Sequence, residues 1–203
     1  MTTCPPNLLR TAPIFRQLDD SDLVDLARLA LSKKLVDGEF LAMQGQVWPY
    51  LVLMMSGELK THKVSPQGRV LGAMRLQSGT LFCSPTILDG DSLPATLESD
   101  GECSLFLWHG DSILPYLKKN NQAMWDLSLL FVKRMRQASE MVEDLAFQPV
   151  AARVARLLLK QHQESGDNHL KRDFTLDEMA SMVGTTPVMV CKIPICRSRI
   201  PQG

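Results

Sequence analysis

An uninterrupted stretch without proline or glycine, residues 121–147, constrains the fold of this chain more than any other feature. Proline breaks a helix interior and glycine weakens it, so a stretch that lacks both favours one long helix. Two series of residues recur in it at intervals of seven, which is typical of a two-stranded coiled coil. The series are Met124, Phe131, Ala138 and Leu145, and Ser128, Met135 and Val142.

A second apolar face on the same stretch consists of Leu127, Leu130 and Met141. A helix with two apolar faces is expected to pack one face on its own domain and the other on a second copy of the chain. The alternative is a core helix in a monomer. The predicted dimer interface consists of Met124, Phe131, Met135, Ala138, Val142 and Leu145.

Short apolar runs separated by turn residues fill the region from Lys34 to His109, and this pattern predicts strands of a sandwich or small barrel. Helical spacing precedes it over residues 7–31 and follows it from Asp111, where Pro115 should keep the first helix short. A further helix is expected from Val150 to about residue 163. The predicted fold is therefore α+β, with a barrel domain over 1–120, a dimerisation helix over 121–147 and a helical domain over 148–203.

A helix–turn–helix is predicted near the C-terminus. Thr175, followed three residues later by Glu178, forms a capping box that starts a short helix. Gly184 permits the left-handed residue of a tight turn, and Thr186 can cap a second helix with Pro187 at its first position. In DNA-binding proteins such a second helix presents its N-terminal residues to base edges. A generic pair of antiparallel helices is the alternative.

The charge distribution fits this division of the chain. Lys and Arg number 22, as do Asp and Glu, but residues 1–147 carry 14 basic against 17 acidic residues and residues 148–203 carry 8 against 5. A mildly basic C-terminal part suits a nucleic-acid partner. We find no apolar run of membrane-spanning length and no secretory signal at the start, so we expect a cytoplasmic protein with no membrane partner. The five cysteines include no C-x2-C pair, which argues against a structural metal site.

From about Leu8 to Lys192 these features together resemble the CRP/FNR family, the cyclic-AMP receptor protein and its relatives. The strongest segment runs from Ser139 to Leu158 and is similar to the family's dimer helix leading over a hinge into its DNA-binding domain. The stretch 175–192 matches the family's helix–turn–helix in register. The resemblance implies a jelly-roll (cupin-like) sensor barrel, a dimer helix and a winged helix. It also implies a homodimeric transcription regulator of a palindromic DNA operator, with RNA polymerase as a further partner.

The ligand-binding stretch departs from the family. Members that bind cyclic nucleotides carry a ribose-binding Glu and, a little later, an Arg that grips the phosphate. Here Cys83 or Ser84 stands at the position of that Glu, and Leu93-Pro94-Ala95 stands where Arg-Ser-Ala would be. Burying a phosphate without its Arg is costly, so we expect a small effector other than a cyclic nucleotide. The candidate effector pocket consists of Phe82, Cys83, Ser84, Leu93, Ala95, Ala138 and Ser139.

No cofactor is expected. An iron–sulfur cluster of the family's type needs several N-terminal cysteines, and Cys4 stands alone there. Haem is the lesser alternative, with His62, Cys83 or Cys4 as candidate axial ligands. An enzymatic cupin-like barrel would need clustered histidine and carboxylate ligands, and the sequence has no H-x-H pattern, so we expect neither a catalytic residue nor a metal site.

The recognition helix is a further departure. The family reads roughly Arg-Glu-x-Val-x-Arg, where this chain has Pro187, Val188, Val190 and Lys192. Pro194 should interrupt the helix, which suggests a frameshifted or truncated C-terminus with an incomplete wing; alternatively, Arg197 and Arg199 contact the DNA backbone. Sequence-specific binding should be weak, and the alternative function is a sensor or interaction dimer that has lost it. The candidate DNA-binding residues are Thr175, Thr186, Pro187, Val188 and Lys192.

Overall fold

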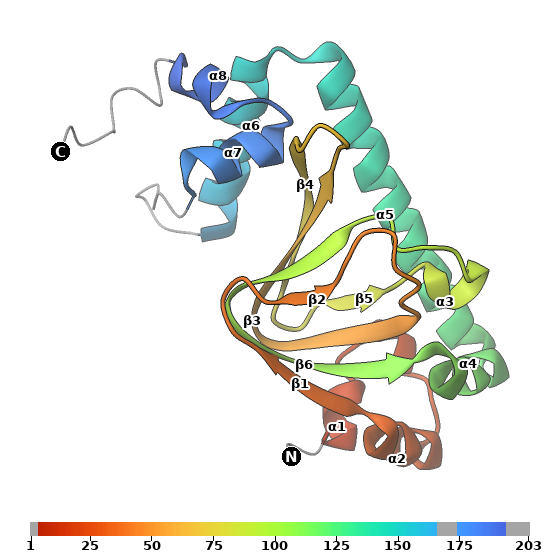
Figure 1. The fold of residues 1–203 in the computed structure, drawn as a ribbon. Helices are drawn as coiled ribbons and strands as arrows, with labels where there is room; N and C mark the ends of the chain where they lie inside the picture. Colours follow the sequence, from red (N-terminus) through yellow and green to blue (C-terminus); the bar gives the residue numbers. More distant parts are fainter. Residues whose placement is uncertain (1–3, 166–173, 194–203) are drawn as a thin grey trace. The chain divides into compact units, whose positions relative to one another are not determined.

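The computed structural model describes residues 4–165 and 174–193, and the chain divides into two compact units (Figure 1). The sheet unit comprises Met1–Lys63 and Met74–Met135. The helical unit comprises Val64–Ala73 and Arg136–Gly203. The unit boundary therefore lies within the long helix, and the turn between two strands groups with the C-terminal helices.

Three short helices replace the single helical region expected over residues 7–31. They are α1 (Pro6–Leu9), the 3-10 helix η1 (Pro13–Phe15) and α2 (Asp20–Leu29). Pro13 begins η1 because proline has no N–H to donate to a preceding turn and is tolerated at a first helical position. Only α2 contains more than two turns of regular helix.

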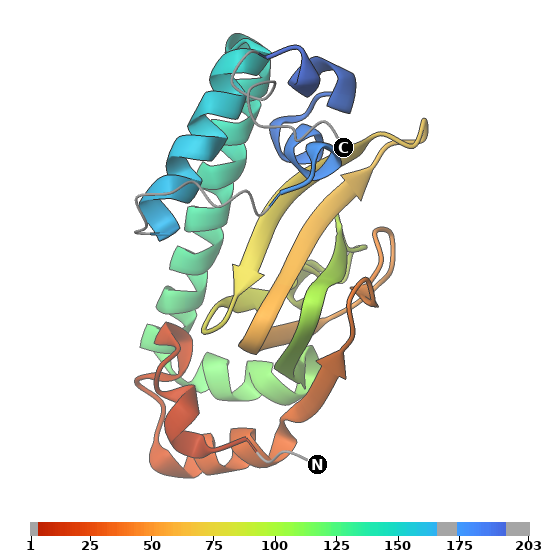
Figure 2. The same cartoon turned by 90° about the vertical axis from the view of Figure 1, so that its left-hand side faces the viewer.

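Six antiparallel-paired strands follow, and they confirm the strands predicted between Lys34 and His109. They are β1 (Leu31–Leu35), β2 (Phe40–Ala42), β3 (Tyr50–Val64), β4 (Val70–Gln77), β5 (Leu81–Cys83) and β6 (Thr96–His109). The sheet order is β1-β6-β3-β4, with β2 paired to β6 and β5 paired to β3. Figure 2 shows strands β3 and β4 running side by side. The result is the jelly-roll-like α+β domain that the sequence predicted.

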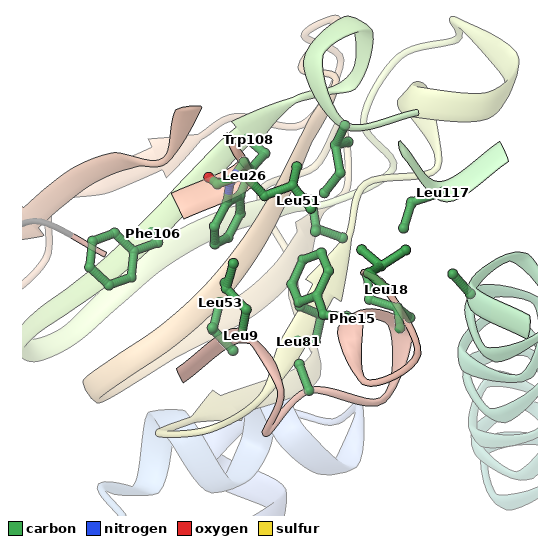
Figure 3. Packing of buried hydrophobic residues seen from close by; sticks show 14 of the residues in the cluster. Leu9, Phe15, Leu18, Leu26, Leu51, Leu53, Leu81, Phe106, Trp108 and Leu117 are labelled. Atoms are coloured by element: carbon green, nitrogen blue, oxygen red, sulfur yellow. The ribbon is translucent and has the colours of Figure 1, made fainter. Parts of the chain in front are cut away.

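The two faces of this sheet carry separate apolar clusters, because successive side chains of a strand point to opposite faces. The outer cluster lies under helices α1, α2, α4 (Gly110–Lys119) and α5 (Asn121–Phe147) and includes Phe15, Leu51 and Trp108 (Figure 3). The indole Nε1 of Trp108 donates a hydrogen bond of 2.7 Å to the carbonyl of Leu26 in α2. The inner cluster is a distinct set, to which Val52 of β3 belongs.

Helix α5 has the bounds expected for the long helix, Asn121–Phe147. The preceding α4 is short, as expected, but it continues through Pro115 to Lys119. In the helical unit, α5 ends two residues before Pro149 and α6 (Val150–Ser165) begins just after it, so the predicted break is present. The unit also contains α7 (Leu176–Val183) and α8 (Pro187–Cys191).

A small apolar core holds α6, α7 and α8 together. Val154 of α6, Met179 and Val183 of α7, and Val190 of α8 are all at most 5% exposed. Burying such side chains contributes roughly 1.5–3 kcal/mol each, which is enough to fix short helices that would not persist alone. The predicted helix–turn–helix is therefore a packed element with its own core.

Candidate functional site

The start of α7 is fixed by a capping box, as the sequence predicted. The Thr175 hydroxyl accepts a 3.2 Å hydrogen bond from the Glu178 amide, and the Thr175 amide donates a 2.7 Å bond to Oε2 of Glu178. These bonds satisfy two amide groups that a helix N-terminus otherwise leaves unpaired. Thr175, proposed from sequence as a DNA-binding residue, therefore has its hydroxyl engaged in capping α7.

The turn between α7 and α8 depends on Gly184, which adopts φ +65° in the left-handed region that favours glycine. Its amide donates to the carbonyls of Ala180 and Ser181 at the end of α7. Thr186 then occupies the N-cap position of α8 and Pro187 its first turn, but the Thr186 side chain makes no capping hydrogen bond. The expected position of Thr186 is thus correct, whereas its expected capping bond is absent.

Helix α8 has one buried and one exposed face. Val190 is fully buried, whereas Val188 is 64% exposed, Met189 is 43% exposed and Lys192 is exposed. Val188 and Lys192 are four residues apart and so share one side of the helix. Met189 was not singled out from sequence, although its place next to Val188 could have suggested it. Pro194, Arg197 and Arg199, on which the expectation of a broken wing depended, lie outside the described residues.

The candidate effector residues lie on both faces of the sheet rather than around one space. Cys83 belongs to the outer cluster under the helices, whereas Phe82, its neighbour in β5, packs against the inner cluster. Leu93 is 2% exposed and belongs to the inner cluster, and Ala95 is half-buried. The period of two along a strand explains this division. Phe82 and Leu93 remain together, and Cys83 is separated from them by the sheet.

Cys83 and Ser84 are both buried. Burial raises the pKa of the Cys83 thiol to about 12, because the thiolate would lose its hydration among apolar neighbours. The Ser84 hydroxyl is fully buried and its oxygen makes no hydrogen bond within the described part of the chain. Ala138 and Ser139 are exposed on the half of α5 that belongs to the helical unit.

Charged residues of three strands form a ladder on the sheet face opposite the inner cluster. Nη1 of Arg75 on β4 lies 2.8 Å from Oε1 of Glu58 and 2.7 Å from Oδ2 of Asp100. Nζ of Lys60 lies 3.2 Å from Oε1 of Glu98. Strand alternation turns these side chains away from buried neighbours such as Leu59 and Leu76. Lys60 and Arg75 are therefore engaged by carboxylates on the outside of the sheet.

The three candidate axial ligands for haem do not form one site. Nδ1 of His62 lies 3.5 Å from Oε2 of Glu98 in the charged ladder. Cys4 and Cys83 both belong to the outer apolar cluster, and each thiol donates to a backbone carbonyl, that of Pro5 and that of Ser84. Burial also raises the pKa of Cys4, to about 11, which disfavours the thiolate that binds iron. Within residues 4–165 and 174–193, no three His, Cys, Asp or Glu side chains are grouped to hold a metal ion.

The first half of α5 presents two apolar faces, as the sequence predicted, but with different members. Met124 and Phe131, expected at the dimer seam, are partly buried against the outer cluster of their own protomer, next to the buried Leu127. Four other residues form an exposed apolar stripe. Only one of them, Met135, belongs to the predicted seam. The stripe consists of Trp125 (61% exposed), Leu129 (48%), Val132 (39%) and Met135 (67%).

Of the predicted seam residues in the second half of α5, Ala138, Val142 and Leu145 are exposed. Trp125 and Val132 are seven residues apart, and Val142 follows Met135 by the same interval. In the first half of α5 the exposed apolar residues Trp125, Leu129 and Val132 therefore lie one position after the predicted series, whereas Met135 and Val142 belong to it. None of the helices in the described ranges is both long enough and apolar enough to cross a lipid bilayer.

Comparison with known proteins agrees with this architecture. Residues 32–120 match the family model of the cyclic nucleotide-binding domain. The chain is 23% identical over 190 residues to the CRP-like cAMP-activated global transcriptional regulator of Mycobacterium tuberculosis, covering 91% of this chain and 85% of that protein. It is 25% identical over 187 residues to the cyclic AMP receptor protein of Thermus thermophilus, with the same coverage.

A solved structure shows the same fold. The crystal structure of a transcriptional regulator assigned to the CRP/FNR family from Eubacterium rectale superposes with a TM-score of 0.77 at 19% identity, covering 90% of this chain and 85% of that one. The M. tuberculosis and E. rectale proteins are both named as transcriptional regulators. Residues 32–120 therefore match a cyclic nucleotide-binding domain, and over nine-tenths of its length the chain is similar in sequence to CRP-like regulators.

Proposed function

We propose that this protein is a homodimeric transcription regulator that binds DNA through α7 and α8 and responds to a small effector other than a cyclic nucleotide. The observation that carries the proposal is the capped, packed helix–turn–helix, whose second helix keeps Val188 and Lys192 exposed on one side. Helix–turn–helix proteins place this side in the major groove. The relatives named above support the same role.

Dimerisation through α5 is supported by the exposed stripe Trp125, Leu129, Val132 and Met135. Monomeric proteins rarely leave a contiguous row of large apolar side chains in water. A two-fold symmetric pairing of α5 would cover this stripe and continue along Val142. Paired α5 helices would also supply two helix–turn–helix elements, which is what a palindromic operator requires.

An effector other than a cyclic nucleotide is supported by the residues at the family's phosphate position. Leu93 and Ala95 offer no charge there, and Leu93 is packed into the inner apolar cluster. Lys60 and Arg75 belong to the ladder on the opposite face of the sheet. A cyclic phosphate among these inner side chains would be buried without a partner, which is strongly unfavourable.

Binding to duplex DNA tests the proposal directly. Fluorescence anisotropy with the promoter region of its own gene at low salt should show saturable binding by a dimer. Lys192→Gln should weaken binding. It should also reduce the steepness of the plot of log affinity against log salt concentration by about 1, because one phosphate contact is lost. The matched control is Lys118→Gln, an exposed lysine on α4 in the sheet unit, which should leave both unchanged.

A folded dimer that binds no duplex even at low salt would refute DNA binding and would favour the second candidate, a sensor or interaction dimer. That candidate is motivated by α8 itself, because Pro187 and Val188 carry no side-chain hydrogen-bonding group for a base edge.

Calorimetric titration with cyclic AMP and cyclic GMP tests the effector part. We expect no saturable heat at millimolar ligand, with the M. tuberculosis relative, named for activation by cAMP, as the positive control. Micromolar binding of either nucleotide would contradict the argument from Leu93 and Ala95.

A further inference from the structure

Helix α8 presents an apolar side chain where a base-reading helix usually presents hydrogen-bonding groups. Val188 lies in the first turn of α8 and 64% of its surface is exposed, although Val190, two residues later, is fully buried. Among the described residues, Val188 is not part of the core that Val190 helps to form, so packing there does not explain its exposure.

Val188 and Lys192 together define the exposed face of α8. The two residues are one helical turn apart and both are exposed, so a ligand on this face meets a branched apolar group and a cation together. In the major groove, thymine presents the one apolar group, its 5-methyl, and apolar side chains contact it. Guanine O6 and N7 and the backbone phosphates accept hydrogen bonds from lysine.

We propose that Val188 is a specificity-determining residue that selects thymine by apolar contact with its 5-methyl group, while Lys192 on the same face supplies the cation. This inference rests on the proposed DNA-binding function and adds the chemistry of the sequence that is read. Discrimination then depends on the methyl group rather than on a bidentate hydrogen-bond pair. It is therefore modest at each base pair, which agrees with the weak specificity expected for this helix.

The test compares thymine with uracil, which lacks the 5-methyl group but keeps the same hydrogen-bonding edge. Full-length protein first selects duplexes from a randomised pool, and the selected duplex is then remade with single thymines of one half-site replaced by uracil. We expect replacement of the thymine that Val188 contacts to weaken binding about fourfold. One buried methyl group contributes ~0.8 kcal/mol, and about 1.4 kcal/mol corresponds to a tenfold change in affinity. Replacement at positions outside the contact should have no effect.

Variants then link the methyl effect to the side chain. Val188→Ala should bind the thymine duplex more weakly and should no longer distinguish it from the uracil duplex at that position. Met189→Ala is the matched control, because Met189 is also exposed but points about 100° away around the helix. It should keep the preference for thymine. Circular dichroism checks that both variants fold.

The outcomes distinguish a failure of the proposed DNA binding from a failure of the proposed thymine preference. If the protein binds no duplex of the randomised pool at low salt, the proposed function fails and this inference fails with it. If it binds DNA but wild type does not distinguish thymine from uracil at any position, the inference alone is overturned. The same holds if Val188→Ala keeps the full thymine preference, because the methyl contact then belongs to another residue.

Discussion

At the scale of single residues, the immediate surroundings of Gly57 decide which residue type can occupy that position. Gly57 in β3 adopts φ +73° where β3 shifts register against β6. A Cβ atom at this position would lie 2.3 Å from the carbonyl oxygen of Glu102 and 2.7 Å from Cβ of Cys103. The close approach of the two strands therefore requires glycine here, both for the backbone angle and for space.

Gly57→Ala should destabilise the sheet unit far more than a backbone angle alone explains. The left-handed angle costs about 1–2 kcal/mol for a residue with a side chain, and separating β3 from β6 should add at least as much. Gly38→Ala is the matched control, since Gly38 has the same φ of +73° with nothing within 4 Å of its Cβ position. Urea unfolding measures both variants. Equal losses would show that the strands separate at no cost.

The buried thiol of Cys83 makes stability depend on pH in the alkaline range. Its pKa is raised by burial from 9.0 to about 12, so the folded protein keeps a proton that the unfolded chain releases. The contribution is complete below pH 9.0 and declines as pH rises toward 12. Unfolding free energy between these values should therefore fall more steeply in wild type than in Cys83→Ala. Identical slopes would contradict the assigned burial.

At the scale of elements, local signals predicted the helix–turn–helix well. Thr175, Glu178, Gly184 and Pro187 each act on backbone within a few residues, so their spacing alone specifies where α7 begins and ends and where α8 begins. The seam of α5 was harder to assign. The heptad pattern placed Met124 and Phe131 on the predicted seam, whereas both pack against the outer cluster of the sheet unit. Which face of α5 packs on the sheet depends on tertiary contacts, and the spacing of residues along the chain does not specify these contacts.

The capping box gives a prediction for α7. Thr175→Ala should destabilise α7 by about 1 kcal/mol, because the Glu178 amide loses its acceptor. Thr186→Ala serves as the control, since Thr186 occupies an N-cap position without a side-chain bond. Hydrogen exchange of the α7 amides should accelerate in the first variant and change little in the second. Equal acceleration in both would show that the hydroxyl bond is not what stabilises this N-terminus.

At the scale of the whole molecule, the order of barrel, long helix and helix–turn–helix could be predicted from sequence, because hydrophobic periodicity changes between these regions. The effector residues could not be grouped correctly in the same way. Phe82 and Cys83 are neighbours in the chain but lie on opposite faces of β5, and only the sheet pairing shows which face is inner. Of these candidate residues, Phe82 and Leu93 share the inner cluster, and Cys83 does not.

The proposed function depends most on the pairing of two chains along α5, and sedimentation equilibrium at micromolar concentration measures this pairing. Wild type should sediment at twice the chain mass of 22.7 kDa. Leu129→Glu should sediment as a monomer, because a symmetric interface would bring two buried carboxylates together. The control Leu159→Glu, an equally apolar exposed position on α6, should remain a dimer. A wild-type protein that sediments at 22.7 kDa throughout would contradict the account.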